Sequence, residues 1–220
     1  MDLGSVRWSG GGHTVDVPTE IDSATGTDDV NTDNARIISE VCDALQNSGT
    51  AEAQNLIQTR YPFEPRPRSS RTYTTREKLE TFQRDGFIDR YTGQRLVCPG
   101  VLFVLSAELG AETFPYHPNW KMDECHIAYW HLYPTIDHVV PIALGGTDDP
   151  ANWVTTSQVM NSSKANFTVE ELGWDVLPPG DLAAWDGLMD WFLKYAAANS
   201  GLENNSRIAD WLKEVRRIAT

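Results

Sequence analysis

The chain has 220 residues, of which 40% are hydrophobic and eight are Trp, and its formal net charge is −13. This length suits one large domain, or a domain with helical extensions, and the composition supplies enough apolar surface for a folded core. Apolar runs fall well short of the ~20 residues of a membrane span, and the first 20 residues lack the basic and apolar regions of a secretory signal, so we expect no contact with a membrane.

The three cysteines, Cys42, Cys98 and Cys125, are far apart and odd in number. They predict neither a disulfide framework nor a cysteine pair that could hold zinc. We therefore expect a reducing, cytoplasmic environment and no structural zinc.

The N-terminal part is rich in Gly, Thr, Ser and Asp and shows little apolar periodicity over residues 1–34. We expect an acidic flexible segment there, with one short strand near residues 13–17. Amphipathic spacing then predicts helices over residues 35–47 and 51–60, the first capped by Asp33 or Asn34.

Residues 60–73 alternate prolines and arginines, which predicts an extended arm rather than a helix. The arm lies in a basic part of an acidic chain, because residues 56–95 hold nine basic and five acidic side chains whereas residues 1–55 hold two and ten. A locally positive segment can still bind a polyanion. Three arginines are therefore candidates for binding nucleic acid: Arg66, Arg68 and Arg71. In the alternative interpretation they pair with Glu64 and Glu77 on a solvated linker.

The middle of the chain is predicted to begin with a helix over residues 75–87, followed by a turn into a short strand over residues 89–97. Residues 101–109 are mainly apolar, and periodicity does not distinguish a buried helix from a strand. An aromatic, loop-rich segment over residues 114–134 then leads into a strand over residues 135–143.

The remaining pattern predicts a short helix over residues 155–166 and two amphipathic helices over residues 181–198 and 206–218. These elements suggest four parts of the chain. They are an acidic segment, a helical region with the basic arm, a central core and C-terminal helices: residues 1–34, 35–75, 76–174 and 175–220.

Five polar residues are concentrated within residues 135–166, around a Gly-Gly turn: Asp137, His138, Asn152, Asn161 and Lys164. Hydrolysis of a phosphodiester needs a hard cation, an activated water and a positioned phosphate. Asp137 and Asn161 offer oxygen ligands that suit Mg²⁺ or Mn²⁺, and His138 can take up a proton near neutral pH. The pattern therefore favours a nuclease that uses one metal ion.

The expected elements also predict where these side chains point. Neighbouring side chains on an ideal strand face opposite sides, so Asp137 and His138 are expected to flank the scissile phosphate from a strand end. Asn161 and Lys164 are three residues apart on the predicted helix and share a face, which predicts that Lys164 binds the phosphate that the metal binds. Asn152 is expected to tie the long turn to the backbone beside His138.

The order and spacing of these residues resemble the HNH, or ββα-metal, nuclease motif. The third position of the motif is Asn rather than His, as in the HNH domain of CRISPR effector nucleases. The resemblance implies an α+β fold in which a ββα-metal nuclease core is embedded in N- and C-terminal helices. It implies that His138 is the general base, that Asp137 and Asn161 hold one Mg²⁺ or Mn²⁺ ion, and that Asn152 fixes the loop. Many family members carry zinc-binding cysteine pairs, and here the aromatic segment is expected to replace that zinc as a packing device.

Three histidines lie in the aromatic segment: His117, His126 and His131. His126 is a candidate site contact, and the alternative is that it packs and hydrogen-bonds among the aromatic rings. A zinc site that also uses Cys98 and Cys125 is a further alternative, although the spacing matches no familiar zinc knuckle.

The sequence therefore predicts a metal-dependent HNH endonuclease that hydrolyses phosphodiester bonds in DNA with water as the nucleophile. The resemblance implies a 5′-phosphate product, and a role in restriction or phage defence suits a free-standing HNH protein of this size. One alternative is a ribonuclease or nonspecific nuclease toxin, and another is a non-catalytic nucleic-acid-binding module. The C-terminal helices are a candidate surface for a homodimer.

Overall fold

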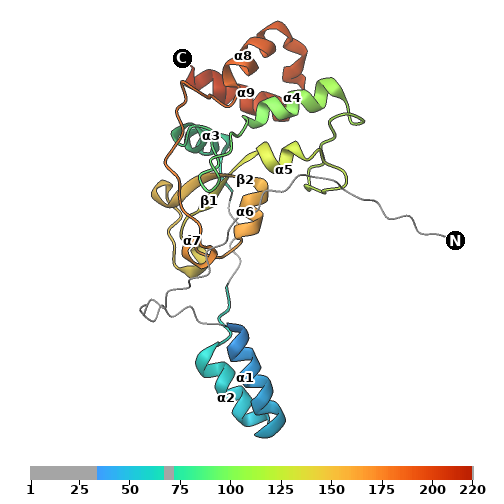
Figure 1. Ribbon diagram of the computed structural model, residues 1–220. Coiled ribbons are helices and arrows are strands. Elements are labelled where there is room, and N and C mark those ends of the chain that lie inside the picture. Colours follow the sequence, from blue (N-terminus) through green and yellow to red (C-terminus); the bar gives the residue numbers. More distant parts are fainter. Residues whose placement is uncertain (1–33, 67–71, 220) are drawn as a thin grey trace, which may run out of the picture. The chain divides into compact units, whose positions relative to one another are not determined.

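The computed structural model describes residues 34–66 and 72–219. The chain divides into two compact units, Met1–Glu64 and Pro65–Thr220 (Figure 1). Helices predominate in the described residues, which also form one two-stranded antiparallel sheet, so the fold class is α+β as predicted.

Several predictions concern segments outside the described residues. They include the flexibility of residues 1–33 and the short strand near residues 13–17. They also include the positions of Arg68 and Arg71 in the basic arm. These stay predictions.

The N-terminal unit is a helical hairpin made of α1 (Asn34–Asn47) and α2 (Thr50–Arg60), which confirms both helices predicted there. Gly49 precedes α2 with φ of 92°, a conformation that glycine adopts without strain. The described residues of this unit bury few apolar side chains: Ile37, Ala44 and Ala53.

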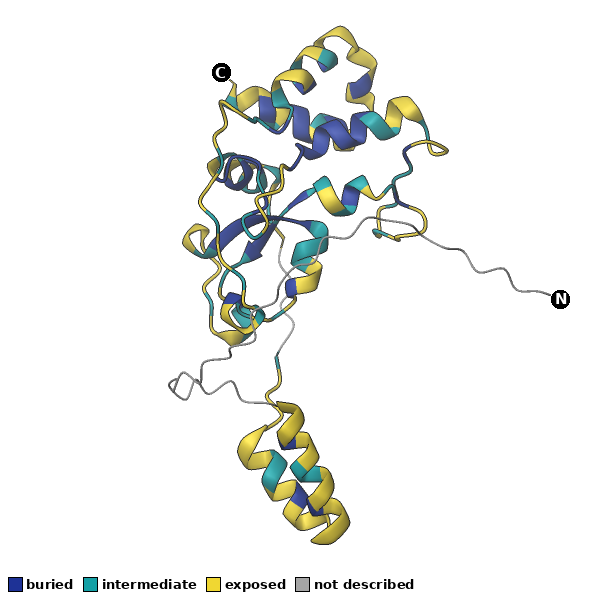
Figure 2. Cartoon of the chain, viewed as in Figure 1, coloured by how far each residue is buried: buried dark blue, intermediate teal, exposed yellow. Residues whose placement is uncertain are grey.

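In the larger unit, four longer helices surround the main core: α3 (Thr75–Arg84), α4 (Pro99–Leu109), α8 (Met189–Ala198) and α9 (Ser206–Ile218). Their inward faces are almost wholly buried (Figure 2). The spacing that predicts α9 is the spacing of its buried residues, which recur every three or four positions: Ile208, Trp211, Leu212 and Val215. None of the helices within the described ranges has both the length and the apolar content that a bilayer crossing requires.

Residues 101–109, which the sequence left as helix or strand, belong to α4. The helix starts with Pro99 at its first turn, where a missing N–H costs nothing, and its residues from Pro99 to Val104 are all buried. A helix enclosed on most sides shows no apolar period, which explains the ambiguity. Gly100 allows close packing, because a Cβ there would lie 2.4 Å from the Phe192 ring.

The prediction that the first helix of this unit reaches residue 87 was wrong. α3 ends at Arg84, because Gly86 and Phe87 have positive φ values of 70° and 48° and turn the chain back. The strand predicted over residues 89–97 is reduced to a single bridge between Ile88 and Arg95.

The helix predicted from residue 181 also begins later, at Met189. Gly187 and Leu188 have φ values of 68° and 65°, and the Asp186 carboxylate accepts the backbone N–H of Leu188. Residues 186–188 therefore form a turn, and α8 begins only after this turn.

The sheet pairs β1 (Pro134–His138) with β2 (Trp153–Ser157), with His138 opposite Trp153 and Pro134 opposite Ser157. Helix α6 (Gln158–Lys164) follows β2 directly, with Ser157 as its N-cap. The strand predicted over residues 135–143 therefore ends at His138, before a tight turn that Pro141 opens.

The helix predicted over residues 155–166 was wrong in its first three residues, which belong to β2. All five β2 residues are buried, so this strand carries no alternation of apolar and polar residues that could have identified it. The shorter elements are α5 (Ala128–Leu132), α7 (Val169–Leu172), η1 (Ile142–Leu144), η2 (Pro150–Asn152) and η3 (Ser200–Asn204).

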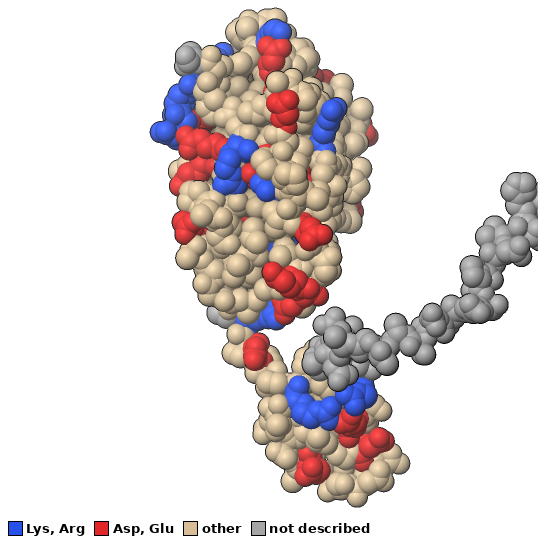
Figure 3. Space-filling model, turned by 60° about the vertical axis from the view of Figure 1, so that its left-hand side comes forward, with Lys and Arg blue, Asp and Glu red and all other residues tan. Residues whose placement is uncertain are grey.

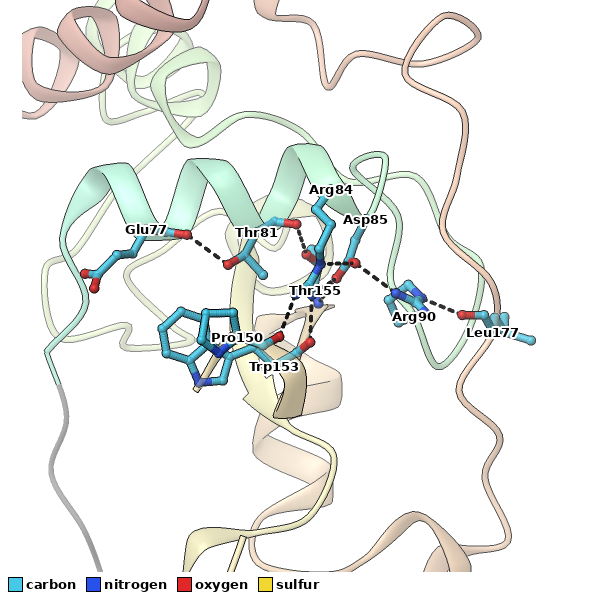
Figure 4. Close-up of polar contacts among 9 residues, drawn as sticks. All are labelled: Glu77, Thr81, Arg84, Asp85, Arg90, Pro150, Trp153, Thr155 and Leu177. Atoms are coloured by element: carbon cyan, nitrogen blue, oxygen red, sulfur yellow. Dashed lines mark hydrogen bonds and ion pairs between the residues drawn. The ribbon is translucent and has the colours of Figure 1, made fainter. Parts of the chain in front are cut away.

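The backbone hydrogen-bonding groups on the outer edge of β2 pair with side chains and a turn instead of a third strand (Figure 4). The Asp85 carboxylate accepts the backbone N–H of Thr155 at 2.7 Å, and Arg84 donates to the Trp153 carbonyl at 2.7 Å. Buried Asp89 accepts the N–H of Ser157 at 2.8 Å. Because an isolated hairpin is marginal in water, these bonds anchor the sheet to the turn after α3.

Candidate functional site

The candidate site lies where β1 ends, beside α6. Asn161 of α6 donates from Nδ2 to the Thr135 hydroxyl at 3.0 Å and to the Ile136 carbonyl at 3.3 Å. Thr135 and Asp137 share one face of β1 because strand side chains alternate. The two predicted metal ligands, Asp137 and Asn161, are therefore on the same side of the sheet.

The Asp137 side chain is buried and accepts two short contacts on one oxygen. Lys164 Nζ lies 2.9 Å from Oδ2, and the Tyr91 hydroxyl donates to the same atom at 2.6 Å. Lys164 also donates to the His138 carbonyl at 2.7 Å and lies over the Tyr91 ring at 5.9 Å. Burial, and then the nearby Asp137 charge, raise the pKa of the Tyr91 hydroxyl well above its usual range.

Lys164 differs from its predicted orientation. Its side chain is 0% exposed and its ammonium faces Asp137 inside the molecule, whereas the sequence predicted a lysine that faces the phosphate. Lys164 does share a helix face with Asn161, as predicted, but this face packs on β1. In this arrangement Lys164 neutralises the predicted metal ligand.

The donor set of Asp137 and Asn161 fits one hard divalent cation. Carboxylate and amide oxygens are ligands that Mg²⁺ and Mn²⁺ accept, and Mg²⁺ usually keeps several waters beside one or two protein ligands. Asn161 directs Nδ2 at β1, which leaves its Oδ1 for a cation. The Lys164 ammonium competes for the Asp137 carboxylate, so a cation would have to share or displace it. Groups of three or more His, Cys, Asp or Glu side chains that could hold a metal do not occur in the described part of the chain.

His138 makes its contacts on the other face of the hairpin. Its Nε2 lies 2.9 Å from Oδ1 of Asp148 and 3.2 Å from the Tyr73 hydroxyl. Trp153, opposite His138 in the sheet, donates from Nε1 to the same Asp148 oxygen at 3.1 Å. The His138 side chain is only 13% exposed, so these neighbours fix its orientation.

Asn152 makes the loop contacts that its position predicted. Its Oδ1 accepts the N–H of Val140 at 2.9 Å, and its Nδ2 donates to the carbonyls of Val140 and Thr147, each at 2.8 Å. The Gly-Gly pair completes the turn: Gly145 has φ of 88°, and a Cβ on Gly146 would lie 1.9 Å from the Val140 carbonyl oxygen. The loop that carries Asp148 is thus tied down two residues after His138.

Arg66 is engaged within the larger unit. Its guanidinium pairs with Glu171 at 2.7 Å and lies 5.1 Å from the centre of the Phe167 ring. The sequence had suggested Glu64 or Glu77 as ionic partners, but Glu77 caps α3 through Thr74. A phosphate would have to compete with Glu171 for Arg66, and the nucleic-acid role of the arm stays a prediction.

His126 packs and hydrogen-bonds among the aromatic rings, as in the alternative interpretation of the sequence. Its ring stacks on Phe114 with centroids 4.2 Å apart, and its Nδ1 accepts the N–H of Ala128 at 3.2 Å. These contacts lie in the aromatic core and involve none of the five site residues. In the face shown in Figure 3, the larger unit carries Lys and Arg side chains interspersed with Asp and Glu, with uncharged surface between them.

Three residues of the site were missed by the sequence reasoning: Tyr73, Tyr91 and Asp148. The two tyrosines lie far from the motif in sequence, and only the tertiary fold brings them to Asp137 and His138. Asp148 lies in the loop between β1 and β2, ten residues after His138. This closeness in sequence is the signal that could have identified it as a partner of His138. Comparison of the chain with protein-family models, with curated proteins and with solved structures finds no match.

Proposed function

We propose that this protein is a metal-dependent endonuclease of the HNH type that hydrolyses phosphodiester bonds in DNA. The observation that supports this most is the strand–loop–strand–helix unit of β1, β2 and α6. It gathers Asp137, Asn161 and Lys164 on one side of β1 and holds His138 at the strand end. Buried, paired ionisable groups beside an oriented histidine are typical of functional sites, which supports the proposal.

The residues divide the chemistry between them. His138 accepts a proton from the attacking water, and its ring is kept in place by Tyr73 and Asp148. Asn152 holds the loop so that this orientation is maintained. Asp137 and Asn161 would hold one Mg²⁺ or Mn²⁺ ion. The ion would supply positive charge against the developing charge on the phosphate and the leaving 3′ oxygen.

The direct test uses supercoiled plasmid with the purified protein in Mg²⁺, Mn²⁺ or EDTA, beside His138→Ala and His126→Ala. We expect nicking or linearisation that needs metal and is lost in His138→Ala, because among the described histidines His138 is the one oriented at the site. His126→Ala is the matched control, because it removes a histidine from the aromatic core and should leave cleavage intact in protein that remains folded.

Three outcomes would change the proposal. Cleavage of RNA in preference to DNA would favour the ribonuclease or toxin alternative. Equal DNA binding by wild type and His138→Ala, without cleavage under any metal, would favour the binding module. Cleavage that persists in His138→Ala would place the catalytic base elsewhere.

A further inference from the structure

Within the described residues, three side chains on the His138 face of the hairpin converge on Asp148. Its Oδ1 lies 2.9 Å from His138 Nε2, 2.8 Å from the Tyr73 hydroxyl and 3.1 Å from Trp153 Nε1. The Tyr73 ring also packs edge-on against the Trp153 ring at 4.9 Å between centroids. Such convergence on one carboxylate oxygen of a loop fixes the positions of all four groups.

The donor and acceptor count assigns the proton on the histidine. Trp153 Nε1 can only donate, and an ionised carboxylate can only accept. The Tyr73 hydroxyl donates to Asp148 at 2.8 Å and lies farther from His138 Nε2, at 3.2 Å. The nearest neighbour of Nε2 in the described residues is the Asp148 carboxylate oxygen at 2.9 Å, which can only accept, so Nε2 carries the proton.

This tautomer leaves Nδ1 of the neutral His138 ring with a lone pair. In the described ranges, Nδ1 of His138 makes no hydrogen bond to another residue of the protein. A histidine whose one nitrogen donates to a carboxylate presents the other nitrogen as a base, and the carboxylate stabilises the imidazolium that forms.

We propose that Asp148 is a positioning residue that holds His138 with its proton on Nε2, so that Nδ1 takes the proton from the attacking water. The water oxygen forms a bond to phosphorus as its proton moves to Nδ1, and the bond from phosphorus to the 3′ oxygen breaks with its electron pair. Tyr73 and Trp153 hold the Asp148 carboxylate in place. The role of Nδ1 rests on the proposed nuclease function, whereas the tautomer is a property of the free protein.

The first experiment reads the tautomer without any cleavage assay. Full-length protein with ¹⁵N-labelled histidine, in EDTA, is studied by NMR at a pH where the His138 ring is neutral. His138→Gln identifies the signals of this ring among the five histidines. We expect the Nε2–H pattern in the wild type, and a shift toward the other tautomer in Asp148→Asn, whose amide can donate to Nε2. An Nδ1–H pattern in the wild type, or an unchanged pattern in both Asp148→Asn and Asp148→Ala, would overturn the proposal.

Asp149→Asn is the matched control, because it removes the same charge one residue away. Asp149 accepts the N–H of Ala151, a bond that an asparagine can also make, and it has no contact with His138 among the described residues. The histidine signals should therefore match the wild type in this variant. Thermal unfolding of each variant shows whether the loop stays folded.

The second experiment measures cleavage in a single turnover together with DNA affinity. We expect Asp148→Asn to cut about 10- to 100-fold more slowly with unchanged affinity, as for other residues that orient a catalytic group. Asp149→Asn should cut at the wild-type rate. A wild-type rate in Asp148→Asn would refute the positioning role. Absence of cleavage by the wild type on any substrate would refute the nuclease, while the NMR result would still decide the tautomer.

Discussion

Lys164 is buried beside a predicted metal ligand, and its charge therefore affects the free energy of unfolding. Its ammonium is fully enclosed and pairs with Asp137 at 2.9 Å, so each charge compensates the desolvation of the other. Removing one partner leaves an isolated charge in the interior, whereas removing both leaves neutral groups. Lys164 therefore stabilises the protein without a metal ion, and under the proposed function a divalent cation would compensate the Asp137 charge in its place.

Lys164→Met should lower the free energy of unfolding by about 3–5 kcal/mol in EDTA, because among the described residues Asp137 then keeps the Tyr91 hydroxyl as its sole side-chain partner. Mg²⁺ should stabilise this variant more than it stabilises the wild type, since no ammonium competes for the carboxylate. Denaturant unfolding with and without Mg²⁺ measures both effects.

The control is the double variant Asp137→Asn with Lys164→Met, which removes both charges and should recover much of the lost stability. A single Lys164→Met variant as stable as the wild type in EDTA would show that the ion pair of Lys164 and Asp137 does not contribute to stability.

At the scale of elements, the Gly-Gly turn between β1 and β2 offers a matched pair of substitutions. Gly146→Ala places a Cβ 1.9 Å from the Val140 carbonyl oxygen and 2.9 Å from Asn152 Nδ2, so it should disrupt the loop and slow cleavage. Gly145→Ala meets no atom within 4 Å and should cost only the left-handed backbone, about 1–2 kcal/mol. Comparing unfolding and cleavage for the two variants tests this, and equal cleavage would contradict it.

The junction of α3 and β2 predicts an acid-sensitive contribution to stability. Burial acts to raise the pKa of Asp85, but hydrogen bonds from Arg84 and Thr155 outweigh it and hold this pKa below its usual range. A depressed pKa in the folded state stabilises the protein above the unfolded value of about 3.9, and this stability is lost as the pH falls through the folded value.

Asp85→Asn should therefore be less stable than the wild type at neutral pH, and the difference should shrink as the pH falls below about 3.9. Unfolding measured as a function of pH checks this, with the exposed Asp175→Asn as the charge control. A difference that does not depend on pH would mean that the Asp85 charge contributes nothing.

The sequence predicted those elements that bury one periodic face. α1 and α9 lie where their apolar spacing predicts them. Residues 155–157 of β2 were wrongly predicted as helix, because all five β2 residues are buried and show no alternation of apolar and polar residues. The motif spacing also predicted that Asn152 ties the turn to the backbone beside His138, and Asn152 bonds to Val140. It could not predict that Lys164 turns inward, because that depends on contacts that only tertiary folding brings together.

At the scale of the whole molecule, the larger unit contains both the main core and the candidate site. The described residues of the N-terminal unit bury only Ile37, Ala44 and Ala53. We therefore expect a fragment of residues 65–220 to fold with the same α+β structure and to retain cleavage. Circular dichroism, thermal unfolding and plasmid cleavage would check this, and an unfolded fragment would show that the core needs the first 64 residues.

Side chains cover hydrogen-bonding groups on both outer edges of the sheet, with a consequence for solubility. Buried carboxylates cover β2, while Asn161 and Lys164 cover the Ile136 and His138 carbonyls of β1. An exposed strand edge is a template for edge-to-edge aggregation, and the groups covered here are not available for such pairing. Substitutions at Asn161 or Lys164 thus uncover hydrogen-bonding groups of β1, and such variants should precipitate more readily at high concentration than variants of His138.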